Sequence, residues 1–353
     1  MRRMTGILNI AAIFFMLTGG LYFFAQLTGG RKQEEMQKNS KKEAERLYQM
    51  RRVRLTKPLT EETRPSRMEE IIGQEDGVKA LRIALGGKNP QHVLIYGPPG
   101  VGKTTAARIV LDWVKQTPDT PFGKDAPFVE IDATTMQYDE RCIADPLLGS
   151  VHDPIYQGAG QLGEMGIPQV KEGAVTRANG GILFVDEIGE LPSMQMNRLL
   201  KVLEDRRVMF ESAYYNGADK KLPPHVRSVF EEGMPADFRL VGATTRSPEE
   251  IPDAIRSRCM EIFFNDLCVT DLERIMEQAA ERAGMELEND VISLLCAYVS
   301  GGRDCVKLIS MLASKAESEG RERITAQDAA WVLKAGHYTR KMVVINDHSS
   351  ANC

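Results

Sequence analysis

The pattern of hydrophobic and polar residues predicts alternating strands and helices in the first part of the main body. Five short apolar runs lie at 92–96, 128–131, 181–186, 240–244 and 260–264, and segments with helical spacing, such as 104–115 and 194–206, lie between them. Short apolar strands separated by helices are typical of a parallel sheet covered on both faces. We therefore predict a three-layer α/β domain over residues 65–265.

After residue 270 the pattern shows helical spacing only. Helices are predicted at 270–283, 289–299, 303–318 and 325–334, before a tail over 338–353. They predict a small all-helical lid domain at 266–337. Within the α/β domain, residues 209–237 form an insertion in which Met209–Tyr215 resembles a strand and Asn216-Gly217 a turn.

The N-terminal stretch 7–27 contains 21 residues without a charge. A helix of that length is about 30 Å long, the thickness of the hydrocarbon core of a bilayer. The apolar region of a signal peptide is shorter and ends at a small-residue cleavage site, and a helix in a protein core is rarely apolar on all sides. We expect a single transmembrane anchor in residues 1–30, in the cell membrane.

Charge is distributed unevenly along the chain. Residues 1–54 contain eleven Lys/Arg and four Asp/Glu, whereas the whole chain has a net charge of −4. Most of these bases follow the apolar stretch, so the positive-inside rule places the body in the cytoplasm. The connector 31–64 is expected to be a solvated helix or a stiff linker, with lipid headgroups as an alternative contact for its bases. The remaining chain is acidic, which argues against a broad nucleic-acid surface.

The six cysteines have neither the spacing of a zinc site nor the density of a disulfide scaffold. Reduced thiols are therefore expected.

A glycine-rich turn follows the first predicted strand and fits the P-loop pattern G-x-x-x-x-G-K-[ST]. In this pattern backbone N–H groups and a helix N-terminus surround phosphate groups. Lys103 is expected to reach the β- and γ-phosphates of ATP, and Thr104 to bind Mg²⁺. The predicted ATP-binding residues of the turn are Gly97, Pro98, Pro99, Gly100, Val101, Gly102, Lys103, Thr104 and Thr105.

Two carboxylates, Asp186 and Glu187, end the third predicted strand. Because ligands gather at the carboxyl edge of parallel strands, both acids should lie near the glycine-rich turn. Asp186 is suited to hold Mg²⁺, and Glu187 to act as general base on water. The pair favours hydrolysis, and a scaffold that binds nucleotide without turnover is an alternative.

Taken together, residues 65–337 resemble the AAA+ superfamily of ring-forming ATPases. The resemblance implies that Ile72, Gly73 and Gln74 lie near the adenine. It also implies a homo-oligomer, usually a hexamer, with nucleotide bound between subunits.

The same resemblance assigns three further roles. Thr245, with Thr244 as second choice, would orient water near the γ-phosphate. An arginine from one subunit would enter the nucleotide site of its neighbour, and Arg258 is the first choice for it. Arg303 would link the position of the lid to the nucleotide state. Arg256 is the alternative to Arg258.

Several stretches are similar to the LonB type of membrane-anchored Lon-like protease of spore-forming bacteria, among them RPSRMEEIIGQE, LLGSVHDPIYQGAG and ATTRSPEEIPDAIRSRC. This similarity implies a motor that pulls on unfolded protein substrates, with Tyr156 in an aromatic pore loop. Residues 338–353 are too few for the Ser-Lys protease domain of that family, and the adjacent Ser314 and Lys315 point apart on a helix. Peptide hydrolysis is thus not supported for this chain alone, and a protease domain acting in trans is an alternative.

Other AAA+ branches share parts of the pattern. Enhancer-binding transcription activators are similar around GGILFVDEI, but their GAFTGA loop is absent here. Clamp loaders and branch-migration motors are similar at VGATTR and RSRC. A DNA-handling motor is therefore the alternative function, although the acidic body leads us to expect no nucleic-acid partner.

Overall fold

The computed structural model describes residues 42–52, 57–136, 145–152, 168–212, 215–218 and 222–341. The chain divides into two compact units, Met1–Lys57 and Pro58–Cys353. In the first unit, residues 42–52 form a helix with exposed side chains. Among the described helices, none has both the length and the hydropathy needed to cross a bilayer. The expected anchor at 7–27 lies outside the described residues.

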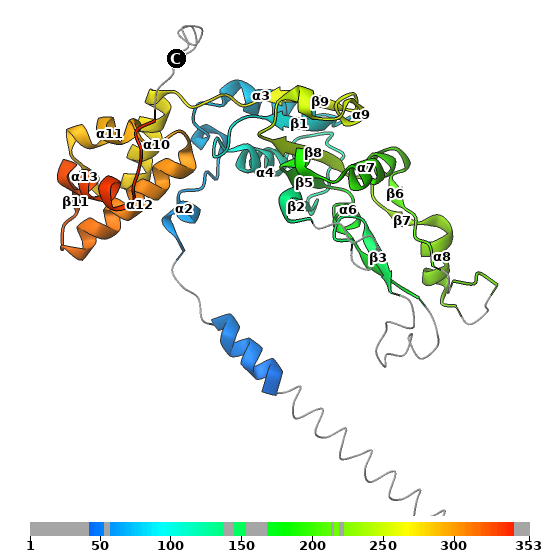
Figure 1. The fold of residues 1–353 in the computed structure, drawn as a ribbon. Coiled ribbons are helices and arrows are strands. Elements are labelled where there is room, and N and C mark those ends of the chain that lie inside the picture. Colours follow the sequence, from blue (N-terminus) through cyan, green and yellow to red (C-terminus); the bar gives the residue numbers. More distant parts are fainter. Residues whose placement is uncertain are drawn as a thin grey trace, which may run out of the picture. The chain divides into compact units, whose positions relative to one another are not determined.

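The second unit contains a parallel sheet of five strands within its described residues (Figure 1). The strand order is β2-β5-β8-β1-β9, and every neighbouring pair is parallel. The strands are β1 (His92–Tyr96), β2 (Phe128–Asp132), β5 (Ile182–Asp186), β8 (Arg239–Thr244) and β9 (Cys259–Phe263). The predicted parallel α/β sheet is confirmed, with strand ends within one residue of the sequence pattern.

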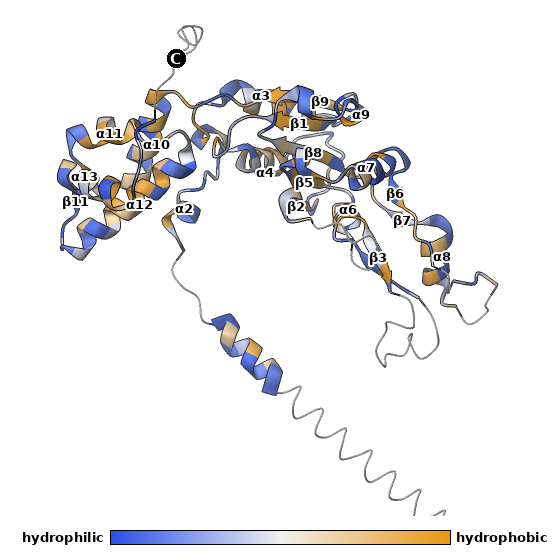
Figure 2. Ribbon diagram, viewed as in Figure 1, coloured by the Kyte–Doolittle hydropathy of each residue, from blue (hydrophilic) through white to orange (hydrophobic). Residues whose placement is uncertain are grey.

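Side chains alternate between the two faces of this sheet. Val93 and Ile95 of β1 pack with helices α3 (Glu75–Leu85) and α4 (Lys103–Val114). Leu94 and Tyr96 pack in a second cluster with α7 (Ser193–Asp205). The strands at the centre are coloured mainly as hydrophobic in Figure 2. Burial of apolar side chains on both faces explains why these strands are continuous apolar runs.

The insertion between α7 and β8 differs from the prediction. β6 (Arg207–Val208) pairs with β7 (Met234–Pro235), and α8 (Pro224–Glu232) lies between them in sequence. Residues 209–212 are not in a strand, so the prediction of a strand starting at Met209 is wrong there. The apolar character of this segment has another cause, because Phe210 is buried in the second cluster. Proline at the first position of α8 favours the helix, since its missing N–H is not needed there.

The helical part consists of α10 (Val269–Arg282), α11 (Asn289–Cys296), α12 (Gly302–Ser318) and α13 (Ala326–Ala335). The four predicted helices are confirmed, but the expectation of helices only is wrong. β10 (Glu286–Leu287) and β11 (Arg323–Ile324) form a short parallel pair. Two strands of two residues are too short to leave a visible period in the sequence.

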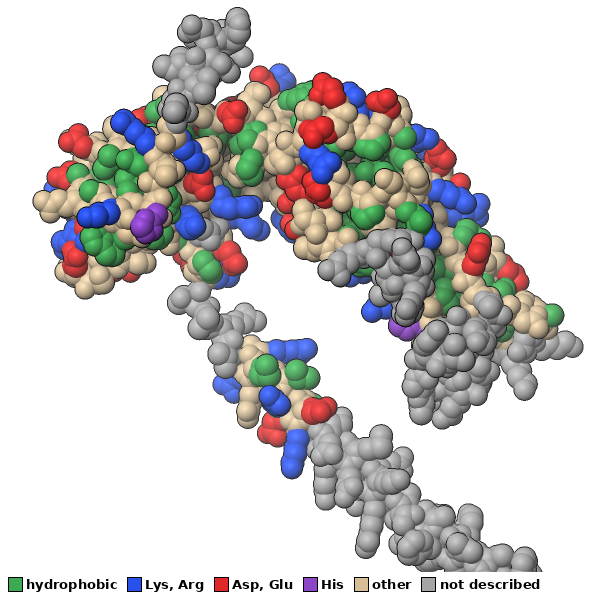
Figure 3. All heavy atoms as spheres, viewed as in Figure 1, with side chains coloured by type: hydrophobic (Ala, Val, Ile, Leu, Met, Phe, Trp, Pro, Cys, Tyr) green, Lys and Arg blue, Asp and Glu red, His purple; other side chains and the backbone are tan. Residues whose placement is uncertain are grey.

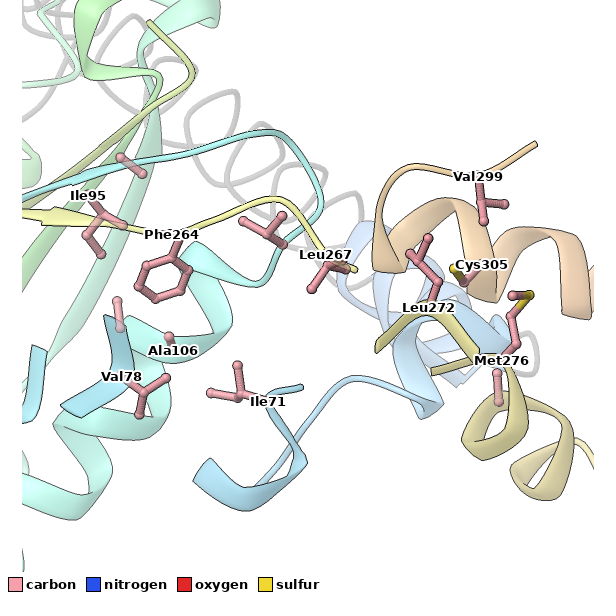
Figure 4. Packing of buried hydrophobic residues seen from close by; sticks show 14 of the residues in the cluster. Ile71, Val78, Ile95, Ala106, Phe264, Leu267, Leu272, Met276, Val299 and Cys305 are labelled. Carbon is pink, nitrogen blue, oxygen red and sulfur yellow. The ribbon is translucent and has the colours of Figure 1, made fainter. Parts of the chain in front are cut away.

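One hydrophobic cluster continues from the sheet into these helices. Figure 4 shows Ile95 and Phe264 on the sheet side, Leu267 in the connection, and Leu272 and Met276 on α10. The α/β part and the helical part therefore share a core, and the division expected near residue 265 is not a break in that core.

The compact unit begins at Pro58, earlier than the linker was expected to end. Leu59, at the start of α2 (Leu59–Glu62), packs against the cluster shared with the helical part. The remaining short elements are β3 (Gly149–His152), β4 (Gln169–Glu172), α6 (Ala174–Arg177), α9 (Asp253–Arg256), η1 (Met68–Glu70), η2 (Ala133–Thr135), η4 (Ile188–Glu190) and η5 (Pro248–Glu250).

Candidate nucleotide-binding site

The glycine-rich turn connects the end of β1 to the start of α4, as predicted. Gly100 and Gly102 have φ values of 80° and 97°, which L residues rarely adopt. A Cβ atom on Gly97 would lie only 2.5 Å from the carbonyl oxygen of Phe264. Glycine is therefore required for the loop to curl closely between the sheet and α4, which is the position where phosphate-binding loops present their backbone N–H groups.

Lys103 begins α4 and is 7% exposed. Its Nζ donates hydrogen bonds to the carbonyl oxygens of Gly97 (2.6 Å) and Pro98 (2.9 Å). Burial lowers the pKa of Lys103, and the nearby charges of Glu187 and Asp186 oppose that shift. The ammonium group thus lies inside the loop, where a phosphate would offer stronger acceptors than the two carbonyl oxygens.

Asp186 is the last residue of β5, and Glu187 follows it at the same edge of the sheet. Burial raises the pKa of Asp186, and the adjacent charge of Glu187 raises it further. Glu187 has a φ of 47°, an unusual value for a residue with a side chain and one often found at functional sites. A hard cation bound at Asp186 would favour the ionised carboxylate.

Glu187 Oε2 accepts two hydrogen bonds from Thr245, one from its backbone N and one from its Oγ1, both at 3.0 Å. Thr244 is fully buried, and its Oγ1 accepts a hydrogen bond from the backbone N of Arg246 at 3.0 Å. The first choice, Thr245, is therefore the threonine beside the proposed base, whereas Thr244 supports the local turn.

A cavity of about 630 Å³ joins these elements. The amino end of α12 closes one side, since the backbone N of Gly302 donates to the carbonyl oxygen of Gly100 at 3.1 Å. The predicted residues that line the cavity are Ile72, Pro99, Gly100, Val101, Gly102, Lys103, Thr104, Thr105, Asp186, Glu187 and Arg303. Gly97 and Pro98 contact Lys103 without lining the cavity.

The cavity is also lined by polar residues that the sequence did not single out, among them Arg64, Gln278, Arg282 and Lys307 as well as Glu61, Glu70 and Glu130. Gln278 and Arg282 lie on one face of α10 with Ile275 and Ala279. Helical periodicity predicts such a face, but no motif marks it as the wall of a binding site.

Gly73 and Gln74 connect the site to the segment that leads into α10. Gln74 is 3% exposed, and its side-chain amide exchanges two hydrogen bonds with the backbone of Asn265, at 2.8 and 3.0 Å. Gly73 has a φ of 73°, and a Cβ atom there would lie 2.5 Å from Asp271 Oδ2. Of the three residues expected near adenine, only Ile72 lines the cavity.

Arg258 lies away from this cavity. It borders a second cavity of about 340 Å³ together with His92 and Arg239, which begin β1 and β8. β1 runs from that edge to the glycine-rich turn, and its five residues span about 16 Å. Arg258 is thus at the edge of the sheet opposite the nucleotide cavity of its own chain.

Arg256 is held by other groups. Its Nε donates to Glu261 Oε1 at 2.7 Å, and the same oxygen accepts a hydrogen bond from the Tyr96 hydroxyl at 3.0 Å. Burial, together with the hydrogen bond to Glu261, raises the pKa of Tyr96 to about 12. Arg256 thus joins α9 to β9 through this network. The expected pore-loop residue Tyr156 lies outside the described residues.

The donor set fits a magnesium nucleotide. The hydroxyl of Thr104 and the carboxylate of Asp186 are hard oxygen ligands of the kind Mg²⁺ prefers. No group of three or more His, Cys, Asp or Glu that could hold a metal occurs within the described residues. Sparse protein ligands are usual for Mg²⁺, which reaches such sites with phosphate oxygens and water.

Comparison with known proteins gives the following matches. Residues 67–219 match the family model for magnesium chelatase, subunit ChlI. The chain is 52% identical over 338 residues to Lon protease 2 of Bacillus subtilis, which covers 96% of this chain and 61% of that protein. It is 27% identical over 282 residues to the Holliday junction branch migration complex subunit RuvB of Fervidobacterium nodosum, which covers 77% of this chain and 66% of that protein.

Solved structures with a similar fold include a RuvB variant from Thermotoga maritima, with a TM-score of 0.52, 22% identity and coverage of 77% of this chain and 73% of that chain. NtrX from Brucella abortus also matches with a TM-score of 0.52, at 19% identity, over 78% of this chain and 57% of that chain. Such low identities show the fold alone. The chain spans 61% of the length of Lon protease 2.

Proposed function

We propose that this chain is an AAA+ ATPase related to the LonB-type Lon-like proteases. In this proposal it hydrolyses ATP to unfold or translocate protein substrates. One observation carries the proposal. A single cavity brings together the glycine-rich turn, the Asp186–Glu187 pair and Arg303. These three features derive from distant parts of the chain and meet where a nucleoside triphosphate would be split.

In this proposal the predicted residues at the cavity have separate roles in catalysis. The loop amides and Lys103 would bind the β- and γ-phosphates, and Thr104 with Asp186 would hold Mg²⁺, which would supply charge neutralisation on the phosphates. Glu187 removes a proton from the attacking water, and the two hydrogen bonds from Thr245 fix the orientation of its carboxylate. Arg303 stabilises phosphate charge from the side of α12.

A homo-oligomer, with a hexamer as the expected ring, completes the site. The position of Arg258 at the edge of the sheet opposite its own cavity supports a role at the nucleotide of a neighbouring subunit. An arginine that neutralises charge in the transition state contributes about 10³–10⁵ to the rate.

The proposal includes a place in the cell and a substrate class. The apolar stretch 7–27 and the basic residues after it support a membrane anchor with the ATPase body in the cytoplasm. Tyr156 is proposed to contact the translocating polypeptide. Peptide cleavage is not proposed for the described residues, because Lys315, the neighbour of Ser314, is engaged with Asp328 (2.5 Å) and Glu319 (2.7 Å).

Replacing Glu187 with glutamine tests the hydrolytic assignment. The Glu187→Gln variant should bind ATP as wild type does but release phosphate at least about 100-fold more slowly, because general-base catalysis contributes about 10²–10⁴. Binding is measured with a fluorescent ATP analogue, and turnover by phosphate release in the presence of unfolded casein. Unchanged turnover in this variant would show that Glu187 is not the base.

The alternative function is a DNA-handling motor, and the similarity to RuvB is the reason to test it. Acidic and basic side chains are interspersed over the face shown in Figure 3. Stimulation of the ATPase by double-stranded DNA, falling steeply with salt, would favour the alternative. Stimulation by unfolded casein and not by DNA supports the protein motor.

A further inference from the structure

The guanidinium group of Arg258 is held by two acceptors from different elements. Its Nη1 donates to the carbonyl oxygen of Ala254 in α9 at 2.6 Å. Its Nη2 forms an ion pair with the carboxylate of Glu204, in the last turn of α7. The side chain remains 38% exposed beside the second cavity. Arg258 is thus restrained on one side and accessible on the other.

The remaining donors of Arg258 can still bind an anion. A guanidinium has five N–H donors, and the two contacts use one on each terminal nitrogen. Three N–H groups, on Nε, Nη1 and Nη2, have no acceptor within the described residues. The guanidinium is planar and the side chain is 38% exposed, so these donors remain available to an anion while Glu204 holds its own donor.

The backbone of Glu204 is held in place by the packing of α7, so its carboxylate can restrain the side chain of Arg258. The preceding turn of α7 is anchored by Leu199, Leu200 and Val202, which are all buried in the second cluster. The ion pair itself is solvent-exposed, with Glu204 at 56%, so it contributes little to folding stability. Its effect is on the direction of the arginine, because it removes rotamers that a free side chain would populate.

We propose that Glu204 is a positioning residue that orients Arg258 toward the nucleotide of the neighbouring subunit. This inference rests on the proposed function, in which Arg258 acts in trans on ATP. Glu204 would not touch the nucleotide. It would raise the fraction of time in which the unused N–H groups of Arg258 face the transferred phosphate.

Steady-state ATP hydrolysis by the full-length protein tests the inference. Glu204→Ala should lower kcat by roughly tenfold with little change in KM, because misdirected catalytic groups reduce rate more than substrate binding. Glu204→Gln keeps an acceptor oxygen and should recover most of that loss. Asp205→Ala is the matched control, since Asp205 is exposed on the same turn and has no ion pair within the described residues. Equal rates for wild type, Glu204→Ala and Asp205→Ala would overturn the inference.

Mixed oligomers distinguish positioning in trans from a structural effect. Lys103→Ala subunits have an inactive site but an intact Glu204–Arg258 pair, so adding them to Glu204→Ala subunits should raise the rate per active site above that of Glu204→Ala alone. A rate that stays at the value for Glu204→Ala at every mixing ratio would mean that Glu204 acts within its own subunit, against the inference.

Arg258→Ala separates the two levels of the proposal. Loss of turnover in Arg258→Ala with full turnover in Glu204→Ala refutes only the positioning role. Full turnover in Arg258→Ala refutes the assignment of Arg258 itself, and the inference with it.

Discussion

Replacing Gln74 with alanine should weaken the junction between the sheet and the helical part. The Gln74 amide donates to the carbonyl oxygen of Asn265 at 2.8 Å and accepts from its backbone N at 3.0 Å. Asn265 lies between β9 and α10, so the pair ties the residues before α3 to the segment that leads into the helices. Alanine removes both hydrogen bonds and leaves the backbone of Asn265 without its partners.

The size of the effect follows from burial. Gln74 is 3% exposed, and each hydrogen bond of this kind contributes about 0.5–1.5 kcal/mol, with a larger loss where a partner stays buried. Asn265 is an exposed residue, so water can replace part of what its backbone loses. We therefore expect a loss of about 2 kcal/mol in the free energy of unfolding. In a unit of this size that corresponds to a Tm lower by about 3 °C.

Thermal unfolding of Gln74→Ala, followed by far-UV circular dichroism, measures this loss. Gln116→Ala is the matched control, because Gln116 is exposed and makes one hydrogen bond to the carbonyl oxygen of Asp112 at 3.2 Å. Gln74→Glu places a carboxylate oxygen against the carbonyl oxygen of Asn265 at a buried position, so its Tm should fall at least as far as that of Gln74→Ala. ADP affinity should also fall in Gln74→Ala, because the neighbouring Ile72 lines the cavity. If Gln74→Ala melts together with Gln116→Ala, the pair does not join the two parts.

Two further predictions concern single groups. Thr245→Ala removes the hydroxyl that donates to Glu187 but keeps the backbone N–H. We expect kcat for ATP hydrolysis, measured by phosphate release, to fall about tenfold in Thr245→Ala and to be restored in Thr245→Ser. Equal rates for wild type and both variants would contradict a role of Thr245 in orienting the base. His92 Nδ1 accepts a hydrogen bond from the backbone N of Leu240 at 3.0 Å, and burial, aided by the charge of Arg239, lowers the pKa of His92 to about 4. Between pH 4 and about 6.5 the folded state therefore binds fewer protons than the unfolded state, so protein stability is highest above this range and falls as the pH falls through it. We expect the free energy of unfolding to decrease by about 2 kcal/mol between pH 7 and pH 5. Urea unfolding at both pH values should show a smaller loss in His92→Gln, and an equal loss would refute the assignment.

Much of the fold was readable from the chain because its signals are local. The apolar runs that became β1, β5 and β8 are buried on both faces, and such strands need no alternation to be recognised. The glycine-rich turn was equally clear, since positive φ values and a close approach to Phe264 permit only glycine there. The two-residue strands β10 and β11 carry no comparable signal, and Phe210 owes its apolar character to packing rather than to a strand.

The residues of the site could be predicted only where a short motif identifies both the side chain and its chemical role. The positions of the lysine in the glycine-rich turn and of the acid pair at the end of a buried strand could be predicted, because a parallel sheet brings the ends of β1 and β5 to one edge. The choice between Thr244 and Thr245, by contrast, depends on which hydroxyl faces Glu187. The walls formed by Arg64, Gln278 and Arg282 belong to segments without a motif.

By itself the sequence determined the strands, the glycine-rich turn and the acid pair, since each is encoded by residues that are close together in the chain. Only the tertiary structure decided that Arg258 lies at the edge opposite its own cavity, that it is paired with Glu204, and that Gln74 binds the backbone of Asn265. These contacts join residues separated by 54 and 191 positions. Pairings at such distances are set by how helices pack on the sheet, and no local pattern of residues records them.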